Sequence, residues 1–194
     1  MTSQKIDRRK KYTRMILKDS LMNLLKVKQL SSITVKEICE VADINRSTFY
    51  AHYYDQFDLL EQIEDELIED MNMYLSAYNF ESEDEALQMT EKLIEYFASK
   101  QEECKTLLNN HSNFSFEQKV RHVARRYIMK SWVEISHLDE ELTEYLSSFI
   151  ISGSIEVMKV WLYKDMDKSP KEMAEIITKM VNKGALGWKD VEER

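Results

Sequence analysis

The chain has 194 residues, of which 32% are charged and 43% hydrophobic, and it contains only three glycines and one proline. So few turn-forming residues argue against a sandwich, a barrel or a Rossmann sheet and favour an all-α fold of amphipathic helices. The net charge of −8 is uneven, because residues 1–60 hold 11 basic and 7 acidic side chains, a net of +4, and the other 134 residues hold 16 and 28, a net of −12. The basic part is either a solvated charge run or a surface that meets a polyanion.

Motifs for catalysis, metal binding and membrane insertion are missing from the sequence. Cys39 and Cys104 stand far apart without a pairing pattern, which predicts free thiols in a reducing cytoplasm. No apolar run approaches the ~20 residues of a membrane span, and the first residues lack the apolar segment of a signal peptide. His111, His122 and His137 lack partners at metal-ligand spacing, and no phosphate loop or nucleophile elbow occurs. We therefore expect a cytoplasmic protein that is not an enzyme, with no membrane contact, no metal and no cofactor.

The first quarter of the chain predicts three helices. Apolar residues at helical spacing predict a long helix over residues 8–28. Thr34 and Glu37 form a capping box that starts a short helix. Asn45 is the expected cap of a second short helix, which reaches about Tyr53. Two short helices joined by a tight turn and packed across a longer one describe a helix-turn-helix.

The rest of the chain predicts a helical body. Asp55 is the expected cap of a connecting helix whose inner face begins at Phe57. Residues 102–110 form either a short helix or a loop. No segment alternates with period two, so we expect no sheet. Four further helices are expected to begin at the start signals Ser82, Ser115, Asp139 and Ser169.

The second short helix carries the residues expected to read DNA. The N-terminal end of a recognition helix reaches base edges, and this one begins with the polar side chains Asn45, Arg46, Ser47 and Thr48. Arg46 is the expected base-reading residue, because its guanidinium matches both acceptors of guanine. Tyr50, His52 and Tyr53 are donors that can reach phosphate or sugar, although Tyr53 can also pack. We expect the cations of residues 8–14 to neutralise phosphates.

This part of the chain resembles the DNA-binding head of the tetracycline-repressor (TetR) family of bacterial regulators, through the segment TVKEICEVADINRSTFYAHYYDQFDLL. The positions that agree in register are Thr34, Ile38, Ala42, Ile44, Ser47, Thr48, Phe49, Tyr50, His52, Leu59 and Leu60. Three positions depart from the family pattern: Gln29 and Asp43 stand where glycine is usual, and Gln56 where a phosphate-binding lysine is common. INRSTFY and the tail FIISGSIEVMKVWL further resemble a Firmicute branch of dihydroxyacetone-kinase regulators.

The resemblance implies an architecture and a function. Residues 8–65 would form the DNA-binding domain, and residues 66–188 a helical regulatory and dimerisation domain reached through the connecting helix. The implied contacts are to phosphate for Thr34 and Lys36, to bases for Arg46, Ser47 and Thr48, and to the backbone for Tyr50 and His52. The implied function is a sequence-specific transcriptional regulator, a repressor released by a small-molecule effector. The alternative is a co-regulator of the same fold that a protein partner controls.

The body carries two expected surfaces. Side chains that favour an effector pocket, although such residues more often form a core, are Met71, Tyr74, Met89, Phe97, Tyr127, Met129, Trp132 and Met158. The long helix after Asp139 is apolar on two sides, and its glycine permits close approach of another helix. The expected dimer face consists of Phe149, Gly153, Val157, Trp161, Ile177 and Met180. A two-fold homodimer would read a pseudo-palindromic operator of duplex DNA with recognition helices about 34 Å apart.

Overall fold

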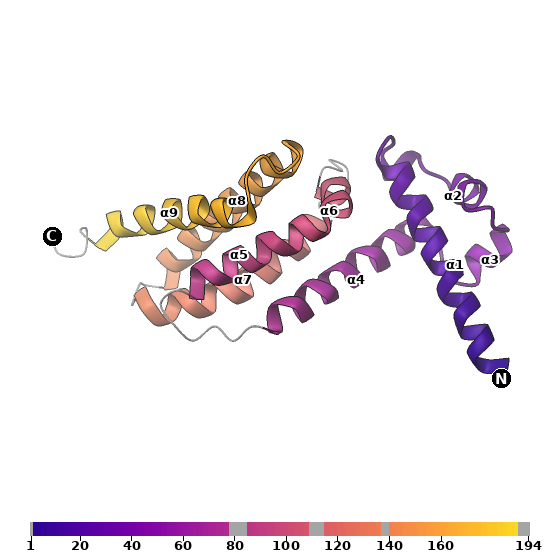
Figure 1. Ribbon diagram of the computed structural model, residues 1–194, viewed down its shortest axis with the longest axis horizontal. Helices are drawn as coiled ribbons and strands as arrows, with labels where there is room; N and C mark the ends of the chain where they lie inside the picture. Colours follow the sequence, from indigo (N-terminus) through magenta and orange to yellow (C-terminus); the bar gives the residue numbers. More distant parts are fainter. Residues whose placement is uncertain (1, 78–84, 109–114, 137–139, 190–194) are drawn as a thin grey trace. The chain divides into compact units, whose positions relative to one another are not determined.

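The described part of the chain is helical between its turns. The computed structural model describes the backbone of residues 2–77, 85–108, 115–136 and 140–189, and the side chains of residues 8–77, 87–108, 115–126 and 141–181. Over these ranges the chain forms nine α-helices, one short 3-10 turn and no strand, which confirms the expected all-α fold. The helices, coloured in chain order in Figure 1, are α1 (Thr2–Leu25), α2 (Val35–Ala42), α3 (Arg46–Tyr50), α4 (Gln56–Ser76), α5 (Glu85–Ser99), α6 (Gln101–Leu108), α7 (Ser115–Ser136), α8 (Glu140–Tyr163) and α9 (Pro170–Lys189).

The helices fall into two compact units. The first unit holds residues 1–67 and 106–116, and the second unit holds residues 68–105 and 117–194. α4 is continuous from Gln56 to Ser76, so it starts in the first unit and ends in the second. The boundary expected after residue 65 falls inside this helix. The division into a DNA-binding domain and a regulatory domain stays a prediction.

α1 begins earlier in the chain than the sequence predicts. It starts at Thr2 instead of residue 8, and it ends at Leu25 instead of residue 28. At the end of α1 the backbone forms a turn, in which the N–H of Lys28 donates to the carbonyl of Leu24 at 2.9 Å. The sequence does not predict the early start, because apolar spacing identifies only the helical turns that pack on the core. Among the described residues of α1, Leu17 is the first that is fully buried.

Local hydrogen bonds hold both ends of α2. At its start the expected capping box is present: the Glu37 N–H donates to Thr34 Oγ1 at 3.2 Å, and the Thr34 N–H donates to Glu37 Oε2 at 2.9 Å. At its end Asp43 takes the left-handed conformation, with a φ of 53°. The N–H of Ile44 then donates to the carbonyl of Cys39 at 3.0 Å. This is a Schellman motif, in which glycine is the usual residue at the position of Asp43.

We expect the substitution Asp43→Gly to stabilise the first unit. A left-handed backbone costs a residue with a Cβ atom roughly 1–2 kcal/mol, less for Asp than for bulkier side chains, and glycine avoids that cost. Because glycine also loses more entropy on folding, the net gain should be about 0.5–1 kcal/mol. Chemical denaturation measures it, with Asp43→Ala, which keeps the Cβ atom, as the matched control. A glycine variant no more stable than the alanine variant would show that the turn holds no strain.

We expect the free energy of unfolding to change with pH through Glu37, at the start of α2. A hydrogen bond from Lys28 Nζ, 2.5 Å from Glu37 Oε1, and further ones from Thr34 lower the pKa of Glu37 from 4.5 to about 2. A carboxyl group with a depressed folded-state pKa stabilises the fold above its unfolded pKa and loses that contribution as the pH falls through the folded one. We therefore expect the free energy of unfolding of the Glu37→Gln variant to change less with pH between 4.5 and 2 than that of the wild type. Acid titrations followed by circular dichroism check this, and identical curves for the two proteins would contradict it.

α4 begins where the sequence predicts but buries a different set of residues. Asp55 caps it, since its Oδ1 atom accepts from the N–H groups of Phe57 and Asp58 at 2.9 Å each. Phe57, expected on the inner face, is instead exposed. The buried stripe starts at Leu59 and Leu60, because the helix meets the core only from there onward.

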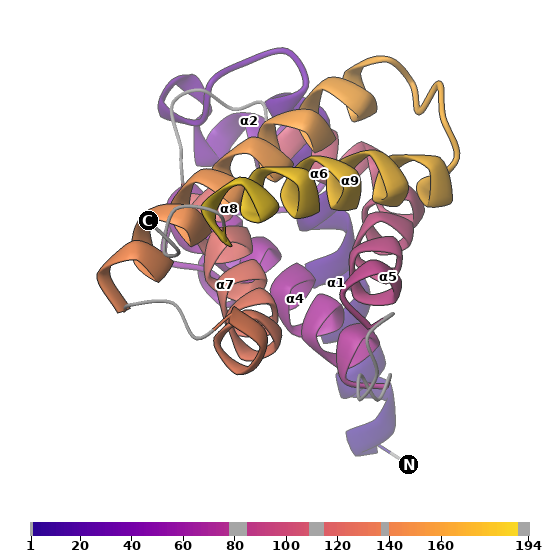
Figure 2. The same ribbon diagram turned by 90° about the vertical axis from the view of Figure 1, so that its left-hand side faces the viewer.

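The second unit contains α5, α7, α8 and α9. α9 packs chiefly on α5, and it follows α8 after a tight turn, so the two helices run in opposite directions (Figures 1 and 2). The turn contains two residues with positive φ, Asp165 (50°) and Met166 (58°). The indole N–H of Trp161 donates to the carbonyl of Lys168 at 2.9 Å, and Lys105 Nζ lies 2.9 Å from Asp165. None of the helices over the described ranges is long and apolar enough to cross a membrane.

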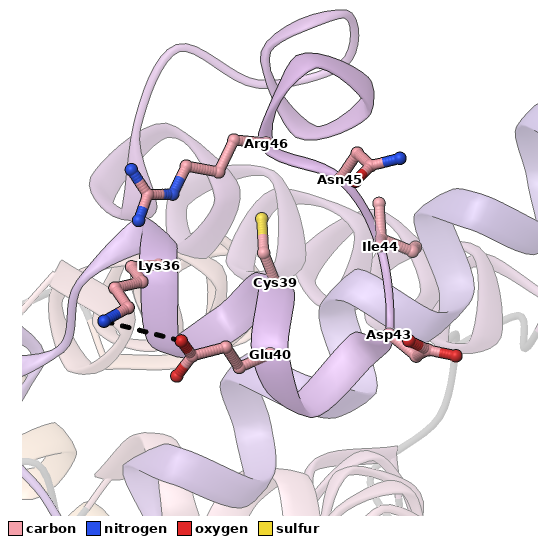
Figure 3. Close-up of a pocket in the computed structure, with 7 residues that line it drawn as sticks. All are labelled: Lys36, Cys39, Glu40, Asp43, Ile44, Asn45 and Arg46. Carbon is pink, nitrogen blue, oxygen red and sulfur yellow. Dashed lines mark ion pairs between the residues drawn. The ribbon is translucent and has the colours of Figure 1, made fainter.

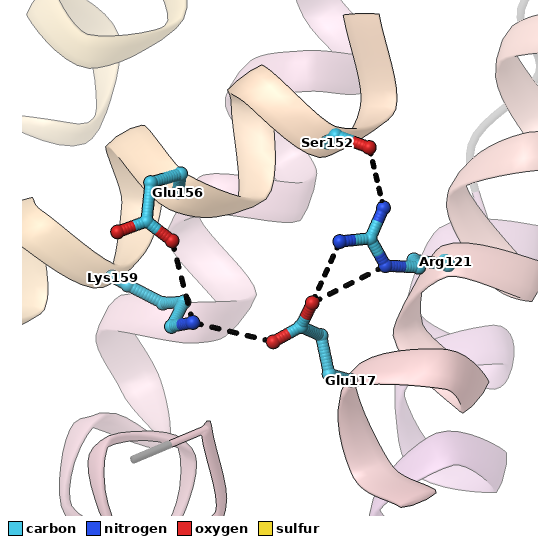
Figure 4. Close-up of polar contacts among 5 residues, drawn as sticks. All are labelled: Glu117, Arg121, Ser152, Glu156 and Lys159. Carbon is cyan, nitrogen blue, oxygen red and sulfur yellow. Dashed lines mark hydrogen bonds and ion pairs between the residues drawn. The ribbon is translucent and has the colours of Figure 1, made fainter. Parts of the chain in front are cut away.

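A polar cluster joins α7 to α8 (Figure 4). Glu117 lies at its centre, with Arg121 Nη2 at 2.7 Å and Lys159 Nζ at 3.2 Å from its carboxylate oxygens. Arg121 also donates to Ser152 Oγ at 2.7 Å, and Lys159 pairs with Glu156 at 3.3 Å. Burial opposes ionisation of Glu117, but the two cations outweigh it and lower the pKa of that carboxyl group. The side chains of α7 and α8 are thus connected by an ion pair and a hydrogen bond.

Candidate nucleic-acid interface

α3 has one buried and one exposed side. Phe49 is fully buried, and the edge of its ring meets the ring of Tyr50 with 5.6 Å between the ring centroids. Because Phe49 anchors the helix on the core, the residues at the helix start point outward, and Asn45, Arg46 and Ser47 are exposed. Asn45 takes the N-cap position, but its side chain makes no capping hydrogen bond. The start of α3 thus presents polar side chains to solvent.

An open depression lies between α2 and the start of α3 (Figure 3). Its volume is about 490 Å³, and its lining consists of Lys36, Cys39, Glu40, Asp43, Ile44, Asn45 and Arg46. The two cations of this lining balance its two carboxylates, so the depression offers both donors and acceptors without net charge. Base edges in the major groove present a pattern of donors and acceptors, which such a surface suits.

An exposed ion pair crosses the depression along α2. Lys36 Nζ lies 3.6 Å from Glu40 Oε1, one helical turn away. Exposed pairs of this kind contribute only about 0.3–0.5 kcal/mol, so Lys36 can exchange Glu40 for a phosphate at little cost. The side chain of Arg46 lies on the same side of the depression as Lys36 (Figure 3).

The two thiols of the chain are free and buried. Cys39 lies in the wall of the depression, and burial raises its pKa although the charge of Arg46 acts in the opposite direction. Burial also raises the pKa of Cys104. Thiols with raised pKa values are poor nucleophiles and poor metal ligands. Among the described residues, no group of three or more histidine, cysteine or carboxylate side chains could hold a metal ion.

The other expected DNA contacts differ in their exposure. Thr34 and Tyr50 are exposed, and Thr48 and His52 are half-buried. Tyr53 is only 2% exposed, and burial is the main reason that its pKa rises to about 12. A ring fixed in the core does not reach DNA, so we correct the expectation and remove Tyr53 from the contact set.

Two acidic residues belong to this surface although the sequence pattern did not single them out. Glu40 and Asp43 line the depression together with Lys36. Glu40 follows Lys36 by four residues, which places these two on one side of α2, whereas Asp43 lies in the turn after the helix and its carboxylate points away from them (Figure 3). The four-residue spacing is visible in the sequence and is the signal that identifies Glu40. Carboxylates at this position limit the attraction of α2 for a polyanion.

α8 exposes an apolar stripe on the side away from its own core. Tyr145, Phe149 and Val160 are exposed, with Phe149 at 79%, and Met180 of α9 is exposed as well. A Cβ atom added to Gly153, which lies between them along the helix, would meet nothing within 4 Å. Exposed apolar side chains that share one helix face are typical of an interaction surface.

Three other residues expected in the dimer face are less accessible. Trp161 and Ile177 are buried within the single chain, and Val157 is half-buried. Trp161 packs at the turn after α8, where its indole N–H forms a hydrogen bond to the carbonyl of Lys168. We therefore leave Trp161 and Ile177 out of the proposed dimer face.

The residues expected to line an effector pocket are packed side chains where the structure describes them. Those buried in the second unit are Met71, Met89, Phe97 and Met158. Tyr74 is half-buried, and its hydroxyl donates to Glu95 Oε2 at 3.0 Å. The side chains of Tyr127, Met129 and Trp132 lie outside the described residues. The effector pocket stays a prediction.

The second half of the chain matches a known family. Residues 84–183, just over half of the chain, match the family described as "Transcriptional regulator C-terminal region" (TetR_C_8). A stretch of 66 residues, 34% of the chain, is 36% identical to the "Uncharacterized HTH-type transcriptional regulator YxbF" of Bacillus subtilis (strain 168). That match spans 16% of the length of this relative.

Three solved structures share the fold over most of the chain. The TetR transcriptional regulator from Streptococcus agalactiae 2603V has a TM-score of 0.72 and 22% identity, covering 92% of this chain and 98% of that one. FadR from Bacillus subtilis, solved in complex with stearoyl-CoA, has a TM-score of 0.61 and 15% identity, covering 86% and 96%. The dihydroxyacetone kinase operon activator DhaS has a TM-score of 0.58 and 15% identity, covering 89% and 96%. The resemblance to that last branch is thus a distant structural one.

Proposed function

We propose that this chain, which belongs to the TetR family of transcriptional regulators, binds duplex DNA in a sequence-specific manner through α2 and α3. One observation carries the proposal: Asn45, Arg46 and Ser47 are exposed beside an open depression, while Phe49 anchors their helix in the core. The N-terminal end of a recognition helix is the part that reaches base edges in the major groove. As a member of this family the protein is a regulator and not an enzyme.

The side chains of this surface divide into two roles. Those proposed to contact base edges are Asn45, Arg46, Ser47 and Thr48. Those proposed to contact phosphates are Thr34, Lys36, Tyr50 and His52. Phosphate contacts fix the register of the protein on the duplex, and base contacts provide the selectivity. Gln56 stands where the family commonly has a phosphate-binding lysine, so the proposed set of backbone contacts does not include this position.

The proposal includes a homodimer. The exposed stripe of α8 around Phe149 and Gly153, with Met180 of α9, fits a second copy of the same stripe across a two-fold axis. A two-fold dimer places its two recognition helices about 34 Å apart, or a multiple of that distance. The operator is therefore expected to be a pseudo-palindrome.

Selection of bound duplexes from a random pool tests the proposal. We expect enrichment of an inverted repeat whose half-site centres lie about 10–10.5 base pairs apart, or a multiple of that spacing. The purified full chain is the bait, and Arg46→Ala processed in parallel controls for selection by charge alone. A pool that stays random after repeated rounds would refute sequence-specific binding.

We further propose that the protein is a repressor whose regulation passes along α4. This helix follows α3 in the chain, and its later residues Met71 and Leu75 are buried in the second unit. An effector that tilts α4 would change the spacing of the two recognition helices. DNA grooves repeat at fixed spacing, so a small displacement would cost contacts in both half-sites.

A small-molecule effector is the favoured trigger, and the stearoyl-CoA held by the FadR structure supports this class of control. An effector that weakens operator binding must itself bind more weakly when operator is present, by the same factor, typically about 5- to 150-fold. Calorimetric titrations of stearoyl-CoA with and without operator measure both affinities. Equal affinities would rule that compound out.

A protein partner is the second candidate for the trigger. The side chains proposed to line the pocket, such as Met89, Phe97 and Met158, are buried as a packed core would be. The residues after 60 also carry a net charge of −12, which suits a basic partner. A compound that binds the purified chain and releases operator would decide for the small molecule.

A further inference from the structure

We propose that Lys105 and Glu117 are positioning residues for DNA binding, which hold the two ends of residues 106–116 through ion pairs with Asp165 and Lys159. The inference rests on the proposed DNA binding. It adds to α4 a second connection, through which the proposed dimer helix α8 acts on the first unit.

Residues 106–116 belong to the first unit, although the rest of that unit consists of residues 1–67. α6 runs into this stretch after Lys105, and α7 leaves it after Phe116. The buried side chains among its described residues are Leu107, Leu108 and Phe116. The residues that border the stretch, Lys105 and Glu117, belong to the second unit, so each is joined to the first unit by one peptide bond.

Both bordering residues form ion pairs with the end of α8 and the turn after it. Lys105 Nζ lies 2.9 Å from Asp165 Oδ1, in that turn. Glu117 Oε2 lies 3.2 Å from Lys159 Nζ, near the end of α8 (Figure 4). Lys159 precedes Asp165 by only six residues. One short piece of chain therefore contacts both ends of residues 106–116.

The backbone of this turn is strained. Asp165 and Met166 both take left-handed conformations, with φ of 50° and 58°. The N–H of Met166 donates to the carbonyl of Trp161 at 3.0 Å. For methionine a left-handed conformation is an outlier, which persists only where the surrounding structure holds it. Because Lys105 is one of the groups that hold the turn, we expect the turn to respond when residues 106–116 move.

The proposed dimer face lies on the same part of α8. Val160, which follows Lys159 directly, is exposed as part of the apolar stripe. A partner protomer packed on Val160 would immobilise the end of α8 and, through the two ion pairs, residues 106–116. A first unit that is ordered before DNA arrives loses less conformational entropy on binding. We therefore expect loss of the ion pairs to weaken operator binding.

Hydrogen exchange tests whether the turn responds to DNA. The amides of Asp165 and Met166 are followed in the full chain, with and without the selected operator. Because coupling is reciprocal, operator binding should slow their exchange by about 1.5- to 5-fold, the range that one exposed ion pair can transmit. In Lys105→Gln the operator should no longer change these rates, whereas Lys179→Gln, which breaks an exposed ion pair with Glu175 on α9, should behave as the wild type. Wild-type rates that are the same with and without operator would overturn the assignment.

Operator affinities of two single variants separate positioning from charge. Lys105→Gln removes a cation and Asp165→Asn removes an anion, and asparagine tolerates the left-handed backbone. An effect on DNA attraction alone would have opposite signs in the two variants. Loss of the ion pair should instead lower operator affinity in both, by about 1.5- to 5-fold per protomer, and the double variant should lose no more than either single one. Fluorescence anisotropy measures the affinities, and thermal denaturation checks that each variant is folded.

Glu117→Gln tests the other end of the stretch. The variant keeps the shape of the side chain and removes its charge. It should lower operator affinity more than Lys105→Gln does, because the side chains of Glu117 and Lys159 are only 15% and 19% exposed. A higher operator affinity for Asp165→Asn, single effects that add in the double variant, or an unchanged affinity for Glu117→Gln would overturn the assignment and leave the proposed DNA binding intact. A selection with the wild-type chain that yields no operator would refute the proposed DNA binding itself.

Discussion

Replacement of Arg46 by alanine will remove the preference for one base pair in each half-site of the operator. The side chain is exposed at the start of α3, beside the depression that contains Lys36. A bidentate contact between guanidinium and guanine contributes about 1–3 kcal/mol of discrimination, roughly 5- to 150-fold in affinity. Because a two-fold dimer uses Arg46 twice, we expect the loss at both symmetric positions.

Lys36→Ala is the matched control for this prediction. Both substitutions remove one cation from the lining of the same depression, but Lys36 is proposed to hold a phosphate. It should weaken operator and random duplex alike and leave their affinity ratio unchanged. Competition titrations with duplexes altered one base pair at a time measure both effects. An Arg46→Ala protein with unaltered preference at every position would show that another residue reads the bases.

The substitution Gly153→Leu will weaken the homodimer without destabilising the single chain. A Cβ atom at this position meets nothing within 4 Å, so the larger side chain fits the protomer. Leucine is also the better helix former, by up to about 1 kcal/mol. In a face where two α8 helices cross, the added side chain holds the partner away at a cost of about 1–3 kcal/mol per copy. The dissociation constant of the dimer should therefore rise at least about tenfold.

Sedimentation measures the dissociation constant, and thermal denaturation measures the stability of the chain. Ser148→Leu is the control, because Ser148 is exposed on the same helix but lies about 100° around it from Phe149. It should leave the dimer unchanged. A Gly153→Leu protein that dimerises as the wild type does would place the interface elsewhere.

Short-range features of the fold followed from the sequence because their causes lie within a few residues. The capping box of Thr34 and Glu37 formed as expected, and both the N–H and the hydroxyl of Ser169 donate to Glu172 at the start of α9. Such bonds depend on side-chain type and spacing alone. The same holds for Asp43, whose left-handed conformation is one that aspartate tolerates.

Features that depend on packing did not follow from the sequence. Tyr53 carries a donor that suits DNA contact, and its burial on Phe49, 5.7 Å between ring centroids, becomes visible only in the folded unit. Phe57 fits the apolar pattern of α4, yet it lies before the first residue that meets the core. Trp161 fits the apolar side of the long helix that was expected to meet a second chain, yet it is buried within the single chain, where its indole N–H donates to the carbonyl of Lys168.

The candidate DNA interface was partly visible in the sequence. The polar start of α3 follows from Asn45 and Arg46 and their position after a helix-turn signal. The balance of charge in the depression requires the structure, because Glu40 and Asp43 come from α2 and the turn that follows it. The packing of α1 on α2 also requires the structure, because no local spacing rule describes contacts between separate helices.

Titration of the wild-type protein against two versions of its selected operator tests whether it binds a specific sequence as a two-fold dimer. One duplex carries both half-sites, and the other carries one half-site intact and one scrambled. We expect two protomers on the intact duplex and an affinity at least about 100-fold lower for the half-scrambled one, because one recognition helix of the dimer loses its base contacts. Equal affinities for the two duplexes would contradict sequence-specific binding by a two-fold dimer.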